Sequence, residues 1–114
     1  MTAEFERLIA ERRGRLDVLL TSVESQLEAI RAARGAAHDD DEHDPEGSTL
    51  STEWSRAEGQ RADVSRELAE LDAALERLAD GTYGVCTSCG NPIPRERLRL
   101  RPAATLCVPC ASRQ

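Results

Sequence analysis

The feature that most constrains this chain is a set of four cysteines in two Cys-x-x-Cys pairs, Cys86/Cys89 and Cys107/Cys110, with 17 residues between the pairs. Two such pairs at this separation are typical of a tetrahedral zinc site with four thiolate ligands. Because four thiolates leave no open coordination position, we expect one zinc ion with a structural role. The alternatives are two disulfides, which require a secreted chain, and a redox-active Cys-x-x-Cys centre, which requires a βαβ context.

The composition of the chain changes near Gly81. Residues 1–80 contain 20 acidic residues and 10 arginines, whereas residues 81–114 contain five arginines and one acid. The net charge of −6 is therefore the sum of −10 and +4, and all four cysteines lie in the basic part. We expect two domains, a hairpin over residues 1–80 and a four-cysteine zinc finger over residues 81–114.

The first of these domains carries a heptad pattern. From Ile9 to Ile30, and again from Leu50 to Leu78, apolar residues and two arginines recur at alternating steps of four and three. This pattern is typical of coiled-coil helices. We predict helices over about 3–34 and 49–80, joined by a tip loop over 35–48. The predicted fold class is all-α: a long antiparallel two-helix coiled-coil hairpin with a small C-terminal four-cysteine zinc finger.

The two arginines at seam positions are Arg13 and Arg61. We expect their aliphatic stems to pack in the seam and their charged heads to reach Asp or Glu at flanking positions. A role in setting the helix register is the alternative. In an antiparallel hairpin of this length, Ile30 is predicted to lie opposite Trp54.

The segment around the cysteines resembles a known family. It runs from Gly81 to Ile93 as Gly-Thr-Tyr-Gly-Val-Cys-Thr-Ser-Cys-Gly-Asn-Pro-Ile, and Arg97-Leu98, Pro102 and the second cysteine pair follow. With the helix that leads into it, this segment resembles the DksA/TraR zinc-finger family, of the type with four cysteine ligands. The resemblance implies a regulator, not an enzyme, that binds RNA polymerase. In this family the coiled coil enters the secondary channel and its acidic tip alters transcription initiation.

The resemblance assigns the partner-binding tip to a run of acids in the loop, and these candidates are Asp39, Asp40, Asp41, Glu42, Asp44 and Glu46. Family members carry an Asp-x-x-Asp-x-Ala pattern at the tip. Counted back from Cys86 without gaps, Glu46 takes the place of the second Asp of that pattern, and His43 takes the place of the first. Such a run of acids is also typical of a solvated loop.

A second candidate surface is the basic run of the finger, formed by Arg95, Arg97, Arg99 and Arg101. We hypothesise that these arginines contact the polymerase. The alternatives are that they offset the negative charge of the zinc-bound thiolates or that they bind DNA. Sequence-specific DNA binding is disfavoured because the acidic residues 1–80 would repel a duplex.

The remaining features concern location and alternative functions. No apolar run approaches the ~18–20 residues that span a bilayer, and residues 1–13 lack the apolar stretch of a signal peptide. We expect a cytoplasmic monomer with no membrane partner. Because four residues follow Cys110, we do not expect the C-terminal helix that helps longer family members to bind ppGpp. The alternative function is a coiled-coil/zinc-finger adapter, or a nucleic-acid-binding zinc module, that does not act on RNA polymerase.

Overall fold

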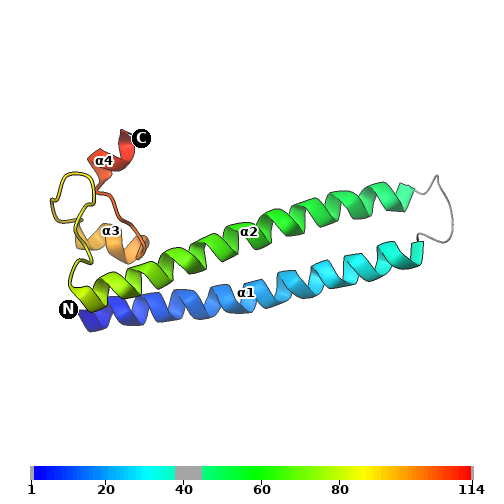
Figure 1. Cartoon of the computed structure of the whole chain (residues 1–114), viewed down its shortest axis with the longest axis horizontal. Helices are drawn as coiled ribbons and strands as arrows, with labels where there is room; N and C mark the ends of the chain where they lie inside the picture. The colour runs from blue at the N-terminus through cyan, green and yellow to red at the C-terminus, as the bar shows by residue number, and fades with distance from the viewer. Residues whose placement is uncertain (1, 38–44, 114) are drawn as a thin grey trace. The chain divides into compact units, whose positions relative to one another are not determined.

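The computed structural model describes residues 2–37 and 45–113, with side chains for residues 2–35 and 49–113. Four helices follow one another along the chain (Figure 1), namely α1 (Thr2–Ala37), α2 (Pro45–Asp80), α3 (Arg95–Leu100) and α4 (Val108–Ser112). The predicted all-α fold class is confirmed, and extended pairing within the described ranges is limited to an isolated bridge between Val85 and Pro92. None of these helices is both long enough and apolar enough to cross a membrane.

Both long helices extend further toward the predicted tip loop than the sequence pattern indicates. Helix α1 continues beyond residue 34 to Ala37, and α2 begins at Pro45 instead of at residue 49. Proline suits a first helical position because its φ is already helical and the N–H that it lacks would have no intrahelical acceptor there. The helices thus include both ends of the predicted loop 35–48, and residues 38–44 lie outside the described part.

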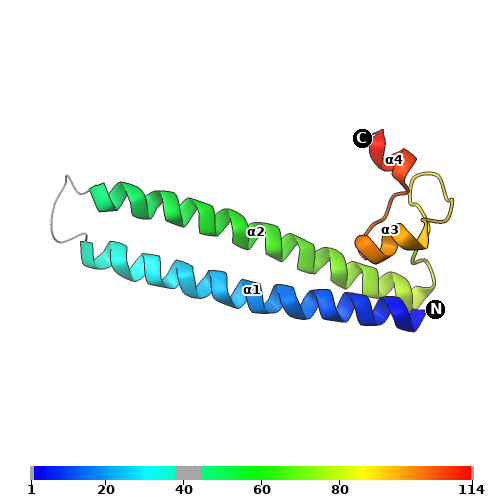
Figure 2. The same ribbon diagram turned by 180° about the vertical axis from the view of Figure 1, so that it is seen from behind.

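The chain forms two compact units, and each unit contains a segment of both long helices. The first unit comprises residues 1–15 and 68–114, and the second comprises residues 16–67. Within each unit, the segments of α1 and α2 run antiparallel and side by side (Figures 1 and 2). Each unit has a hydrophobic cluster of its own.

The cluster of the second unit occupies the predicted seam. Its buried members are Val23, Leu27, Ile30 and Ala57, and the partly buried Leu50 and Trp54 pack against them. Ile30 and Trp54 lie in one cluster, in agreement with the antiparallel register. The guanidinium carbon of Arg34 lies 5.9 Å from the centre of the Trp54 ring, which is cation–π distance.

The two seam arginines place their charged heads on carboxylates, as predicted. Arg61 Nε donates to Glu58 one turn earlier in α2, at 3.0 Å. In the first unit, Arg13 Nε lies 3.2 Å from Asp72 Oδ1, which links α1 to α2. Because both pairs are partly exposed to water, each contributes only modestly to stability.

The cluster of the first unit is built around the cysteines. Its buried members are Phe5, Cys86, Ile93, Leu98, Cys107 and Cys110. Phe5 comes from the first turn of α1, upstream of the predicted seam. Its ring centroid lies 5.4 Å from that of Tyr83. Figure 2 shows α3 beside the end of α2 and the beginning of α1, where Leu98 of α3 joins this cluster. The coiled-coil base and the cysteine-rich segment therefore share one core.

Two leucines of the first unit provide a matched test of this packing. Leu71 is 1% exposed and Leu100 is 85% exposed. We expect Leu71→Ala to lower the free energy of unfolding by about 2–5 kcal/mol, because it leaves a cavity in a close-packed interior. Leu100→Ala should change it by less than about 0.5 kcal/mol. Urea unfolding followed by far-UV circular dichroism measures both, and equal effects of the two variants would contradict the packing described here.

Candidate metal centre

The first cysteine pair lies on a tight turn that follows α2. The N–H of Gly90 donates to the carbonyl of Cys86, and the N–H of Cys86 donates to the carbonyl of Asn91, both at 2.9 Å. Gly90 has φ +78, a left-handed conformation that glycine adopts without the steric cost of a Cβ. The turn therefore needs glycine directly after Cys89, as the sequence has it.

The second cysteine pair lies at the beginning of α4. Cys107 is the residue before the helix, Cys110 lies within it, and the N–H of Ala111 donates to the Cys107 carbonyl at 2.9 Å. The two pairs are joined by a backbone hydrogen bond from Thr87 to Thr105, also 2.9 Å long. This bond brings the segments that carry the two pairs together.

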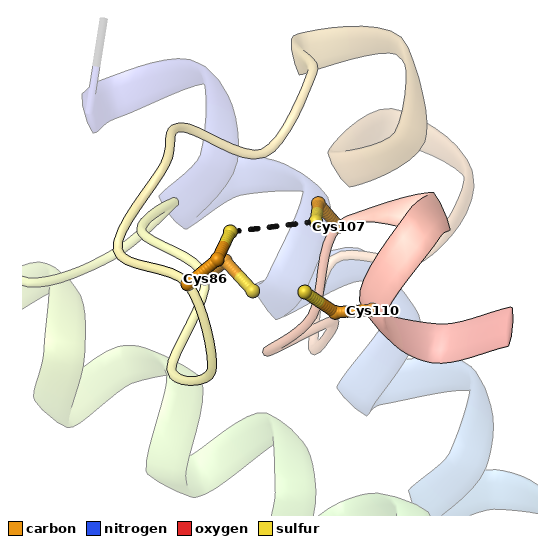
Figure 3. Close-up of side chains that lie close together, drawn as sticks. Cys86, Cys107 and Cys110 are labelled. Carbon is orange, nitrogen blue, oxygen red and sulfur yellow. Dashed lines mark hydrogen bonds between the residues drawn. The ribbon is translucent and has the colours of Figure 1, made fainter. Parts of the chain in front are cut away.

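The four sulfur atoms converge with the dimensions of a metal site. All four lie within 4.8 Å of one another, and the Sγ atoms of Cys89 and Cys107 are 3.7 Å apart. Figure 3 shows the side chains of Cys86, Cys107 and Cys110 directed toward a common space. A tetrahedron of thiolates with Zn–S bonds of about 2.3 Å has sulfur atoms about 3.8 Å apart, whereas a disulfide requires about 2.05 Å. The donor set fits one zinc ion, and none of the four cysteines is in a disulfide.

The protonation of the cysteines reflects this convergence. Hydrogen bonds from the backbone N–H groups of Cys89 and Cys107 lower the pKa of the Cys86 thiol to about 6. The hydrogen bond between the side chains of Cys110 and Cys107 raises the pKa of Cys110 to about 12. One thiolate thus forms near neutral pH, whereas further negative charge beside it needs a cation. Zinc held by the four cysteines would supply that cation, and the remaining thiols would lose their protons on binding it.

Comparison with known proteins agrees with this geometry. Residues 81–114 match the family described as prokaryotic dksA/traR C4-type zinc finger. The chain is 27% identical to transcription factor DksA2 from Pseudomonas aeruginosa, with a TM-score of 0.82 over 99% of this chain and 81% of that one. Residues 81–114 thus match a zinc finger of the DksA/TraR type, and the chain as a whole is similar in fold to DksA2. The expected cofactor, one zinc ion held by four cysteines, is consistent with this match and with the sulfur positions.

Two curated relatives extend the similarity beyond the finger. The RNA polymerase-binding transcription factor DksA of Caulobacter vibrioides is 43% identical over 65 residues, which are 55% of this chain and 46% of that protein. The protein of the same name from Haemophilus influenzae is 34% identical over 84 residues, 69% of this chain and 58% of that protein. The chain thus spans about half the length of these two relatives.

The arginines of the finger differ in what they contact. Arg95 Nη2 and Arg99 Nε donate to the two carboxylate oxygens of Glu4 in α1, at 3.1 and 2.8 Å. The hydrogen bond from Arg99 is the main reason why the pKa of Glu4 lies below its ordinary value. Arg97 Nε donates to the carbonyl of Leu106 at 2.9 Å. Arg95 and Arg99 therefore link α3 to α1, whereas Arg97 joins α3 to the segment before Cys107 within the finger.

Arg101 differs from the other three arginines. It is exposed, and among side chains in the described ranges its guanidinium forms no ion pair. Its backbone N–H donates to the carbonyl of Arg97 at 2.7 Å, which ends α3. Of the four predicted contact arginines, Arg101 has the side chain most available to a partner.

The predicted tip acids are not tested by the structure. Asp39, Asp40, Asp41, Glu42 and Asp44 lie outside the described residues, and Glu46 is described only as part of the α2 backbone. Phe5 and Glu4, which join α1 to the finger, were not predicted from the sequence. Phe5 lies four residues before Ile9, and Arg13 follows Ile9 by another four, so Phe5 falls outside the alternating steps of four and three and the heptad pattern does not mark it.

Zinc removal tests the structural role of the metal. We expect a chelator, or Cys110→Ser, to unfold residues 81–114, because structural zinc sites contribute on the order of 10–16 kcal/mol to folding. Zinc affinity should also fall as the pH is lowered, because protons compete for the thiols, and it should fall more steeply below about 6, where the Cys86 thiolate is protonated as well. Zinc release and the NMR dispersion of Ile93 and Leu98 measure these effects.

The matched control for this test is Ser112→Ala, an exposed change in the same helix α4. It should leave zinc content at one ion per chain. A chelated chain that keeps the native NMR signals of Ile93 and Leu98 would refute a structural role for the metal.

Proposed function

We propose that this chain binds bacterial RNA polymerase and regulates transcription initiation. The observation that carries the proposal is the similarity to transcription factor DksA2, which covers 99% of the chain and so includes the hairpin as well as the finger. The name of the two curated relatives described above, RNA polymerase-binding transcription factor, supports the same partner. These relatives are named as transcription factors, and we propose no catalytic activity for this chain.

The proposed mode of action divides the chain into two parts. The hairpin, residues 1–80, carries a net charge of −10 and inserts its acidic tip into the secondary channel of the polymerase. The finger, residues 81–114, carries +4 before the charge of the zinc site is counted and contacts the outer surface. An acidic segment is electrostatically suited to a channel lined by positive charge. The tip acids then act on the catalytic centre, and the finger sets affinity.

Charge alone also argues against direct binding to DNA. Two zinc-bound thiolate pairs leave a Zn(Cys)4 centre with about −2, which reduces the positive charge of the finger. Arg95 and Arg99 are in addition paired with Glu4. Non-specific duplex binding depends on several free cations that neutralise phosphates. The described part of the finger offers few of them, which favours a protein partner.

Binding to the polymerase is tested first with the zinc-loaded full chain. We expect a one-to-one complex with core RNA polymerase by native mass spectrometry, and Arg101→Ala should weaken it several-fold because it removes an unpaired cation. Arg7→Ala, an exposed arginine of α1, is the control with the same charge change and should have little effect. Absence of a complex at concentrations on the order of 10 μM would contradict the proposed binding to RNA polymerase. A steeply salt-dependent gel shift with duplex DNA would support a nucleic-acid-binding module instead.

The acidic tip is tested by substitutions that remove charge and keep shape. We expect Asp44→Asn combined with Glu46→Gln to leave polymerase binding within about threefold and to abolish the change in promoter-complex lifetime. The control is Glu6→Gln with Glu11→Gln, two exposed acids of α1, which should preserve both properties. Promoter-complex lifetime in transcription in vitro is the measurement. An unchanged effect of the tip variant would remove these acids from the mechanism.

A further inference from the structure

The first compact unit contains a partly enclosed cavity of about 260 Å³. Most of its wall is apolar and comes from Phe5 of α1, Leu78 of α2, and Ile93 and Leu98 of the finger. Three of these side chains are at most 5% exposed, so they form a floor that is already ordered by the core. An engineered apolar cavity of about 150 Å³ binds benzene, so this space is large enough for an aromatic ring with a small substituent.

Two glycines form part of the cavity wall. Gly81 and Gly84 have φ values of +82 and +84, which L-residues with a Cβ adopt only with strain. A Cβ at Gly81 would meet no atom within 4 Å, whereas one at Gly84 would meet Leu98 at 3.4 Å. At Gly84, therefore, a side chain would lie against the Leu98 part of the apolar floor.

One charged residue, Arg95, lines the same cavity. Its guanidinium carbon lies 5.9 Å from the centre of the Phe5 ring, and its Nη2 is held by Glu4 at 3.1 Å. Glu4 also receives Arg99, so one carboxylate is shared between two guanidinium groups. A guanidinium carries five N–H donors in a fixed plane, and the contact with Glu4 through Nη2 leaves others for a ligand.

Besides Arg95, two residues with polar side chains line the cavity, Tyr83 and Thr2. The hydroxyl of Tyr83 donates to the carbonyl of Pro102 at 2.7 Å. Tyr83 therefore contributes its aromatic ring, and not a free hydroxyl, to the cavity wall. Burial raises the pKa of Tyr83 to about 12, and the hydroxyl stays neutral at physiological pH. Thr2 is the remaining side chain with a polar group in the wall. The recognition chemistry is therefore an apolar floor, aromatic faces and one cation.

We propose that this cavity binds a small aromatic carboxylate. The ring lies against Phe5, Ile93 and Leu98, and the carboxylate accepts hydrogen bonds from Arg95. Charge-assisted bonds from a guanidinium to a carboxylate are stronger than neutral ones, so Arg95 discriminates an acid from an uncharged analogue of the same size. This binding concerns a site in the first compact unit and is independent of binding to the polymerase.

The experiment uses the zinc-loaded full chain and benzoate as the probe, with the methyl signals of Ile93, Leu78 and Leu98 followed by NMR. We expect saturable shifts with a Kd on the order of 1 mM, as is usual for so small a ligand. Benzyl alcohol, the uncharged analogue, should bind at least about tenfold more weakly, because it lacks the charge that pairs with Arg95. Arg95→Gln should cause a similar loss, and Arg7→Gln should cause none.

A second pair of variants tests the location without altering the buried wall. Thr2 lines the cavity and is exposed, whereas the adjacent Ala3 is exposed and does not line it. Thr2→Phe should block benzoate by placing a ring at the opening, and Ala3→Phe should not. The proposal is overturned if benzoate causes no saturable shift, if benzyl alcohol binds equally well, or if both members of either pair of variants behave alike.

Discussion

The convergence of four cysteine sulfur atoms is the constraint on which the first compact unit depends. One hydrophobic cluster contains Cys86, Cys107 and Cys110 together with Phe5, Ile93 and Leu98. The candidate metal site is therefore part of the apolar core. The segments that carry the cysteines have few large apolar residues, and such small segments need a metal or disulfides to fold. A zinc ion held by Cys86, Cys89, Cys107 and Cys110 would therefore fix the positions of the apolar residues that pack against α1 and the end of α2.

The ion pairs of the first compact unit follow from that packing. Once the core brings α3 against the beginning of α1, Glu4 meets Arg95 and Arg99, and Arg97 meets a backbone carbonyl. The basic run that looks like a continuous binding surface in the sequence is thus divided into arginines with internal contacts and Arg101, which is exposed. The same arrangement leaves Arg95 beside an apolar cavity, where a cation and aromatic rings act together.

Much of the fold was predictable because its determinants are local. A heptad pattern predicts coiled-coil helices from residue spacing alone, and the cluster of Val23, Leu27, Ile30 and Ala57 lies where that pattern places it. The helix ends were predicted less well. Residues 35–37 and 45–48 were predicted as loop, whereas both stretches are helical. For the second stretch the reason is that Pro45 is compatible with a first helical turn.

The sequence by itself determined the zinc ligands, the all-α class and the seam of the hairpin, because ligand chemistry and helical period are properties of short stretches of chain. Only the tertiary structure decided that Phe5 is a core residue, that Glu4 binds two arginines, and that a cavity lies between Phe5 and the turn that contains Gly81 and Gly84. Each of these depends on residues about 75 to 95 positions apart in the chain coming together. No local sequence pattern predicts these long-range contacts, because they depend on how the finger packs against the two long helices.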